Sequence, residues 1–251
     1  MKQSLAIAAP AMWAAAVLPG AAAALRPEED SKPVLRLLCV GGHPDDPESG
    51  CAGTLARYAQ AGHKTTVIYL TRGERGIAGK SNEEAAAIRT AECQEACRIM
   101  GAKPLFAGQI DGSTEMNKSR VEQLAKLIAA EEPDLLFTHW PIDTHMDHQI
   151  ASELTYRAYL SLPRRPKLFY FEVNTGSQSQ GFKPDVYIDI SSVVEKKKAA
   201  LFAHRSQDGE GIWRQHHEII ASFRGREAGV AAAEAFVQLN REEAARKLPG
   251  I

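Results

Sequence analysis

The chain has 251 residues, of which 44% are hydrophobic and 24% charged, so its length and composition suit a soluble protein with one sizeable α/β domain or two small ones. Lysine and arginine total 30 against 31 aspartates and glutamates, giving a formal net charge of −1. This balance argues against a general nucleic-acid binder, which would carry a basic surplus.

The N-terminus predicts a signal peptide over residues 1–24. Lys2 precedes a mostly apolar run, Leu5–Leu18, and alanines at a suitable cleavage site follow, with cleavage expected after Ala23 or Ala24. A short membrane anchor and a disordered alanine-rich tail are the alternatives. The run is short for a membrane span and contains Pro10, which favours cleavage and an exported, periplasmic or secreted protein with no stable membrane span.

The rest of the chain alternates short apolar runs with helical segments, which predicts strands and helices in turn. Strands are expected at Val34–Val40, Thr65–Leu70, Leu135–Thr138, Leu168–Val173 and Val186–Ile190, with a weaker one at Leu105–Ala107. Helices are expected at 53–61, 81–100, 119–132, 147–160, 193–204 and 228–246. Capping boxes that begin at Ser81 and Ser119 mark two of the helix starts.

Alternation of this kind predicts a single α/β domain over residues 34–247, a Rossmann-like three-layer sandwich with a mainly parallel sheet. The first three strands should step outward in one direction, after which the chain returns to the other side of the first strand. Sites in such sheets lie at the carboxyl ends of the strands where the order reverses. We therefore expect the loops after Val34–Val40 and Leu135–Thr138 to face each other.

Those two loops carry residue types that can bind a metal. The first contains His43, Asp45 and Asp46, and the second contains His145, Asp147 and His148. Two imidazoles and one carboxylate form a common catalytic zinc set that leaves a position open for water, and the surplus groups suit a hydrolytic site that also needs a base and an oxyanion partner. Taken singly, each loop has a simpler interpretation. The first is typical of a turn before a capped helix, and the second is typical of a solvent-exposed helix start. Their pairing at converging strand ends favours the metal site.

The remaining histidines and the cysteines give weaker signals. His63 follows a helix and is expected to be exposed, His216 and His217 lie in a polar stretch without a partner motif, and His139 is either a supporting or a structural residue. All four cysteines are expected to be free buried thiols, because no Cys-x-x-Cys pair is present and the pair at 93 and 97 is poorly spaced for a disulfide.

Several stretches of the sequence resemble a known family. The stretches "HPDDPESGCAGTL", "LTRGERG", "IRTAE" and "HMDH" are similar to the LmbE/PIG-L family of zinc-dependent N-deacetylases, which remove acetyl groups from N-acetylglucosamine-type amines. The resemblance runs from about Val34 to Phe236. It implies an amide hydrolase with Zn2+ as cofactor and a carbohydrate or other small molecule as substrate.

The resemblance also implies a role for each motif residue. Asp45 would be the general base and His145 would stabilise the oxyanion, while Asp147 would orient one of the two histidines beside it. Arg89 and Asp111 match positions that hold sugar hydroxyls. The implied zinc ligands are His43, Asp46 and His148.

Arg89 has a second signal of its own. It shares a helix face with Ala86 and Cys93, and an inward-facing arginine needs either a ligand or a buried partner. Glu92 is the candidate partner. A structural salt bridge and a substrate clamp both stay open.

One departure from the family pattern matters for the mechanism. Some members carry a tyrosine just before the H-x-D-H motif, and residues 141–144 contain none. The proton donor to the leaving amine is therefore open between Asp45 and His145.

The rival functions are a metal-dependent phosphoesterase and a non-catalytic carbohydrate-binding protein on the same scaffold. A nucleotide-dependent oxidoreductase is disfavoured because no G-x-G-x-x-G follows the first strand. The sequence leaves a homo-oligomer possible.

Overall fold

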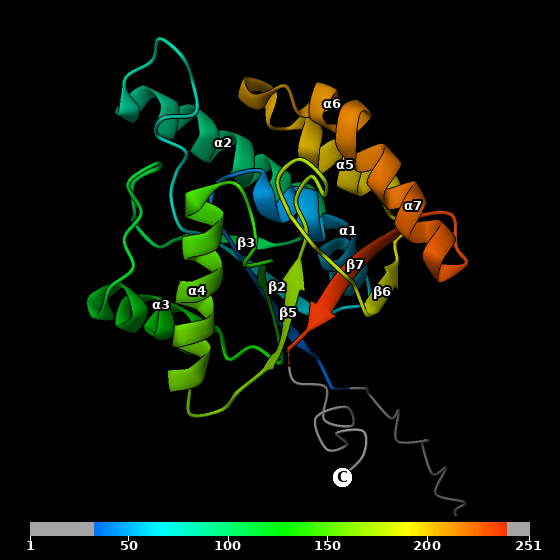
Figure 1. Cartoon of the computed structure of the whole chain (residues 1–251), viewed down its shortest axis with the longest axis horizontal. Coiled ribbons are helices and arrows are strands. Elements are labelled where there is room, and N and C mark those ends of the chain that lie inside the picture. The colour runs from blue at the N-terminus through cyan, green and yellow to red at the C-terminus, as the bar shows by residue number, and fades with distance from the viewer. Residues whose placement is uncertain (1–32, 240–251) are drawn as a thin grey trace, which may run out of the picture. The chain divides into compact units, whose positions relative to one another are not determined.

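The computed structural model describes residues 33–239, which form a layered α/β fold around one sheet (Figure 1). Within these residues the sheet has seven strands in the order β3-β2-β1-β4-β5-β7-β6. The strands are β1 Arg36–Gly41, β2 Lys64–Tyr69, β3 Lys103–Phe106, β4 Leu135–His139, β5 Lys167–Phe171, β6 Val186–Asp189 and β7 Ala233–Gln238. The first five are parallel, and β7 is antiparallel to both β5 and β6. This order confirms the prediction that β2 and β3 follow on one side of β1 and that β4 lies on its other side.

Helices cover both faces of the sheet (Figure 1). They are α1 Asp46–Gln60, α2 Asn82–Met100, α3 Lys118–Glu131, α4 Met146–Ser161, α5 Val194–Phe202, α6 Gly209–Ile212 and α7 Glu218–Ala228, with a 3-10 turn η1 at Arg205–Gln207 and a π-helical turn η2 at Trp213–His217. In β1, Leu37 and Cys39 pack into a core shared with α1 and α2, whereas Leu38 and Val40 pack into one shared with α3 and α4. A strand buried on both faces needs this unbroken apolar run.

Helix α1 begins seven residues before its predicted start at Gly53, because the motif residues themselves open it. Pro47 occupies its first turn, and the Glu48 side chain accepts a hydrogen bond from the Asp45 amide. Two of its residues must be glycine for packing. A Cβ at Gly50 would lie 2.2 Å from the Phe171 ring, and one at Gly53 would lie 2.6 Å from Ile190.

The helix predicted over 228–246 is wrong for its described part. Helix α7 ends at Ala228 because Gly229, with a φ of 72°, caps it, and residues 233–238 form β7 instead. The alanine-rich stretch has helical propensity, but β7 fills the place between β5 and β6, and ladder pairing with both outweighs that preference. The preceding segment, 209–228, is helical although no helix was predicted there.

The predicted signal peptide lies outside the described residues and stays a prediction. Between residues 33 and 239, no helix combines the length and apolar character needed to cross a bilayer. All four cysteines are free and buried, as predicted.

Candidate active site

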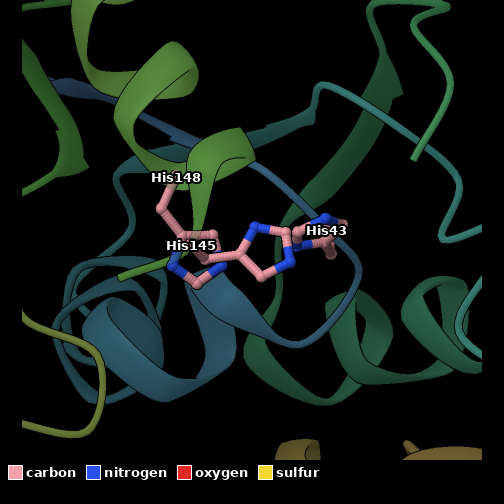
Figure 2. Close-up of side chains that lie close together, drawn as sticks. All are labelled: His43, His145 and His148. Atoms are coloured by element: carbon pink, nitrogen blue, oxygen red, sulfur yellow. The ribbon is translucent and has the colours of Figure 1, made fainter. Parts of the chain in front are cut away.

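The two predicted loops meet at the carboxyl ends of β1 and β4. His43 comes two residues after β1, His145 caps the N-terminus of α4, and His148 lies in the first turn of that helix. Figure 2 shows the three imidazoles facing one another. The ring centre of His43 is 4.7 Å from that of His145 and 5.3 Å from that of His148.

Asp46 joins two of these histidines. One carboxylate oxygen lies 3.2 Å from Nδ1 of His43, and the other lies 3.1 Å from Nε2 of His148. All three residues are buried. The predicted ligands therefore converge from two elements that are about a hundred residues apart in the chain.

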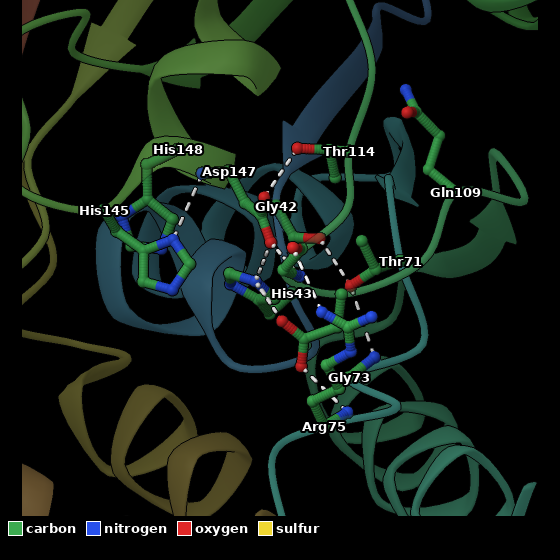
Figure 3. A network of polar contacts seen from close by, with 12 residues as sticks. Gly42, His43, Thr71, Gly73, Arg75, Gln109, Thr114, His145, Asp147 and His148 are labelled. Carbon is green, nitrogen blue, oxygen red and sulfur yellow. Dashed lines mark hydrogen bonds and ion pairs between the residues drawn. The ribbon is translucent and has the colours of Figure 1, made fainter. Parts of the chain in front are cut away.

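A second layer of carboxylates holds the far nitrogens of both rings. Asp147 lies 3.0 Å from Nε2 of His43 and also accepts hydrogen bonds from the Gly112 amide and the Thr114 hydroxyl (Figure 3). Its carboxylate thus orients His43 rather than either histidine beside it in sequence. Asp143, which sequence reasoning missed, lies 3.1 Å from Nδ1 of His148. Such contacts fix the tautomer and the angle of metal-ligating imidazoles.

These contacts decide the charge states of the cluster. Burial alone would lower the pKa of His43, but hydrogen bonds to Asp111, Asp147 and Asp46 raise it well above its usual value. Burial likewise lowers the pKa of His148, yet the charge of Asp46 and the hydrogen bond to Asp143 raise it to about 9. Strong attraction of a proton to a buried site of this kind marks a place where a cation is favoured.

The donor atoms fit a divalent metal ion. Tetrahedral ligands with bonds of ~2.0–2.1 Å lie about 3.3–3.4 Å apart, close to the separations between Asp46 and the two imidazoles. Because the outer carboxylates hold the far nitrogens, Nδ1 of His43 and Nε2 of His148 face Asp46.

Three overlapping sets of residues have donor atoms that lie within 4.8 Å of one another. They are His43 with His145 and His148, Asp46 with His139 and His148, and His43 with Asp111 and Asp147.

His139 packs against the cluster. It is fully buried, stacks on His148 with ring centres 4.2 Å apart, and its Nε2 accepts a hydrogen bond from the Gly42 amide. Burial and the neighbouring charge of His148 lower its pKa to about 4, so it is neutral at pH 7. Its place at the end of β4 was the available sequence signal, and the structure supports the view of it as a supporting residue.

An open cavity of about 340 Å³ leads to these residues. Its wall includes the predicted residues His43, Asp45, Asp46, Arg89, Asp111, His145 and His148, and side chains from later segments, namely Asn174, Gln178, Gln207 and Ile212. Asp111 accepts a hydrogen bond from the Arg75 amide, and its other oxygen lies 3.2 Å from Nε2 of His43. Asp111 therefore faces both the cavity and His43.

Arg89 is buried as predicted, but its partner is not Glu92. Its Nη2 lies 3.2 Å from Oδ2 of Asp45 and donates to the Pro44 carbonyl, whereas Glu92 accepts hydrogen bonds from Ser206. Burial raises the pKa of Asp45, and the positive charge of Arg89 partly offsets that rise.

Glu48 and His204 form a buried pair behind the HPDD turn that sequence reasoning also missed. Glu48 accepts hydrogen bonds from the Asp45 amide and the Tyr69 hydroxyl, and it lies 3.2 Å from Nε2 of His204. The sequence does carry part of this signal, since Glu48 closes the capping box of α1. Nothing near His204 in sequence points to the site.

Comparisons with known proteins find deacetylases among the relatives of this chain. Residues 38–159 match the family described as PIG-L, GlcNAc-PI de-N-acetylase. The diacetylchitobiose deacetylase of Thermococcus kodakarensis is 30% identical over 219 residues, covering 80% of this chain and 82% of that protein. The solved structure of N,N'-diacetylchitobiose deacetylase from Pyrococcus horikoshii has a TM-score of 0.72 at 25% identity, covering 81% of this chain and 83% of that one.

A third relative has a different activity. The 4-oxalmesaconate hydratase of Pseudomonas putida is 26% identical over 223 residues, covering 80% of this chain and 85% of that protein. Relatives of this chain thus include a hydratase as well as deacetylases.

Proposed function

Since the chain belongs to the PIG-L family, we propose that it is a zinc-dependent N-deacetylase that hydrolyses the acetamide of an N-acetylglucosamine-type sugar or conjugate. His43, Asp46 and His148 would hold the ion. The observation that carries the proposal is Asp45, which lines the cavity beside this donor set and contacts Arg89 rather than a metal-facing imidazole. A structural metal site needs no such carboxylate.

Asp45 is the general base. A divalent ion bound at the site would polarise the amide oxygen and acidify the attacking water. The Asp45 carboxylate accepts the proton of that water as it attacks the acetyl carbonyl. Burial raises the pKa of Asp45, which makes the group a stronger base than an exposed aspartate. The same carboxyl group, once protonated, is placed to return the proton to the leaving amine.

His145 stabilises the oxyanion as a neutral hydrogen-bond donor. Its Nδ1 accepts a hydrogen bond from the Asp147 amide, which leaves the ring proton on Nε2. Burial and the charges of His43 and His148 lower its pKa, so it donates through Nε2 without carrying a charge of its own. This adds a protonation state to the oxyanion role that the family resemblance implies for His145.

The cavity supports a carbohydrate substrate. Its volume of about 340 Å³ falls in the range of small-molecule pockets, ~300–1,000 Å³. Asp111 can accept hydrogen bonds from sugar hydroxyls, and the amide side chains of Asn174, Gln178 and Gln207 can both donate and accept. A carboxylate and neutral amides of this kind suit hydroxyl-rich ligands.

Hydration of a carbon–carbon double bond is the second candidate, because one relative is a hydratase. Both reactions need an activated water and a base, and they differ in product. A deacetylase releases one acetate for each amine exposed, whereas a hydratase releases neither. A phosphoesterase would release phosphate and would favour two clustered ions.

The test is acetate release from a panel of N-acetylated sugars, with metal content measured in the same preparation. We expect the wild type to release acetate and amine in equal amounts, and Asp45→Asn to keep its metal while kcat falls on the order of 10²–10⁴-fold. Asp189→Asn, an exposed change at the end of β6, serves as the matched control and should leave kcat unchanged. Turnover by Asp45→Asn at the wild-type rate would overturn the mechanism.

A further inference from the structure

One charged side chain in the wall of the active-site cavity has no partner of opposite charge. Each of the three aspartates in the wall lies 3.2 Å from a nitrogen of an arginine or a histidine. Arg75 lines the same cavity, but its guanidinium forms no ion pair with any residue between 33 and 239. Because an arginine stays protonated in proteins, the cavity carries a positive charge that the fold does not neutralise.

The side chain of Arg75 is held in place by the loop after β3. Its Nη1 donates to the carbonyl of Gly112 at 3.2 Å, and its backbone amide donates to the carboxylate of Asp111. The φ of Gly112 is 65°, and a Cβ added there would lie 3.2 Å from the same Nη1, so the guanidinium packs directly against the glycine. The Gly112 amide in turn donates to Asp147, which orients His43. Arg75 is therefore tied to the turn that supports the proposed metal site.

Most of the hydrogen-bonding capacity of this guanidinium is unused. Arginine has five N–H donors in a planar fork, and in the described part of the chain only Nη1 of Arg75 has an acceptor. Arg75 is exposed whereas Asp111 beside it is buried, so the free donors lie nearer the mouth of the cavity. A fixed fork of this kind suits a carboxylate or a phosphate, because each can accept two parallel hydrogen bonds from it.

A second arginine of the same loop has a different environment. Arg72 is also exposed, but its Nε donates to the hydroxyl of Thr90, and its guanidinium lies 5.9 Å from the centre of the Phe106 ring. Arg72 is not among the residues that line the cavity. One arginine of the loop after β2 therefore packs on the protein surface, and the other is available to a ligand in the cavity.

We propose that Arg75 binds an acidic group of the substrate, so that the N-acetylated sugar conjugate also carries a carboxylate or a phosphate. The inference rests on the proposed deacetylase function and adds the class of conjugate to it. The family resemblance implies that Asp111 holds a sugar hydroxyl, and a hydrogen bond joins Asp111 to Arg75. The guanidinium would then reach a substituent close to that hydroxyl. Arg75 acts on the choice of substrate, whereas Asp45 acts on the reaction itself.

The experiment measures kcat/KM, by amine release, for matched acidic and neutral substrates. One pair is the N-acetylglucosaminide of glycolic acid and that of its neutral amide, and the other is N-acetylglucosamine phosphorylated at the anomeric oxygen and the methyl glycoside of the same anomer. Both pairs are assayed with the wild type, with Arg75→Gln and with the matched control Arg72→Gln, which removes an equal charge from the same loop outside the cavity. The ratio of acidic to neutral substrate is the readout, because damage to the fold or the metal site would lower both values.

We expect the wild type and Arg72→Gln to prefer the acidic member of at least one pair by about 10- to 100-fold, and Arg75→Gln to keep a preference of less than about 3-fold. The pair that shows the larger preference identifies the acidic group as carboxylate or phosphate.

Three results would overturn the inference and leave the deacetylase function intact: a wild type that turns over neutral sugars without preferring the acidic ones, an Arg75→Gln variant that keeps the preference, or an Arg72→Gln variant that loses it equally. A wild type that releases no amine from any of these substrates, nor acetate from any sugar of the panel, would overturn both.

Discussion

Two buried clusters of charged side chains reach the first turns of helix α1, and only one of them faces a cavity large enough for a ligand. The HPDD cluster opens onto about 340 Å³, whereas the cluster around Lys197 and Glu234 encloses about 20 Å³. Ser49 lines both. Both clusters hold buried acids and bases, so burial and charge alone do not tell them apart.

The difference lies in how their charges are matched. In the closed cluster each charge meets its opposite: Lys197 lies 2.6 Å from Glu234, which also accepts from the Gly53 and Thr54 amides, and Arg224 pairs through two nitrogens with Glu172. Such pairing balances these four charges without a ligand. In the open cluster, by contrast, several carboxylates surround the imidazoles, and a bound cation would neutralise the excess negative charge.

In the open cluster, removal of a predicted metal ligand should have the largest effect on activity. We expect His148→Ala to lose its bound metal and, with it, several kcal/mol of transition-state stabilisation, on the order of 10⁴-fold in kcat/KM. Elemental analysis and acetate release on the same sample measure both quantities. His63→Ala is the control, because His63 lies next to the amino end of β2, away from the cavity. Full metal occupancy in His148→Ala would contradict the ligand assignment.

In the closed cluster, loss of one charged partner should lower the stability of the fold rather than the activity. We expect Lys197→Met to lower the free energy of unfolding by about 3–5 kcal/mol, because it leaves the Glu234 carboxylate buried without its cation. Adding Glu234→Gln should recover much of that loss, since the uncompensated charge is then gone. Urea denaturation measures both steps, and the double variant should keep the metal content of the wild type. If Lys197→Met were as stable as the wild type, the pairing argument would fail.

His217 offers a smaller effect that depends on pH. It is buried beside Lys197, and burial followed by the charge of that lysine lowers its pKa well below 6.5. The unfolded chain therefore binds a proton below pH ~6.5 that the folded chain refuses, so this contribution to stability is present above that pH and declines as pH falls, by up to about 1.4 kcal/mol per unit. Replacing His217 with Leu should remove this part of the acid sensitivity.

Urea unfolding of the wild type and His217→Leu at pH 8 and pH 5.5 measures that difference. His43, His148 and His204 have raised pKa values and act in the opposite direction, but both proteins contain them, so their contribution cancels. Equal losses of stability on acidification would contradict the assignment of a neutral buried His217.

The sequence by itself determined the parallel part of the fold and the meeting of the two motif loops. Unbroken apolar runs such as Leu37–Val40 can only be buried on both faces, and parallel strands carry their following loops to one edge of the sheet. His43 and His148 had to meet once that order was fixed. Their residue types then indicated a metal.

Only the tertiary structure decided which groups hold these residues in place. Asp143 lies just before the HMDH motif but is not part of it, and His204 lies in a segment without any motif. Asp147 contacts His43 instead of the side chains of its own neighbours in sequence. The chain from Ala233 to Gln238 became a strand for the same reason. Local propensity acts over a few residues, whereas a place in a sheet or a hydrogen bond across a cavity depends on where distant segments come to rest.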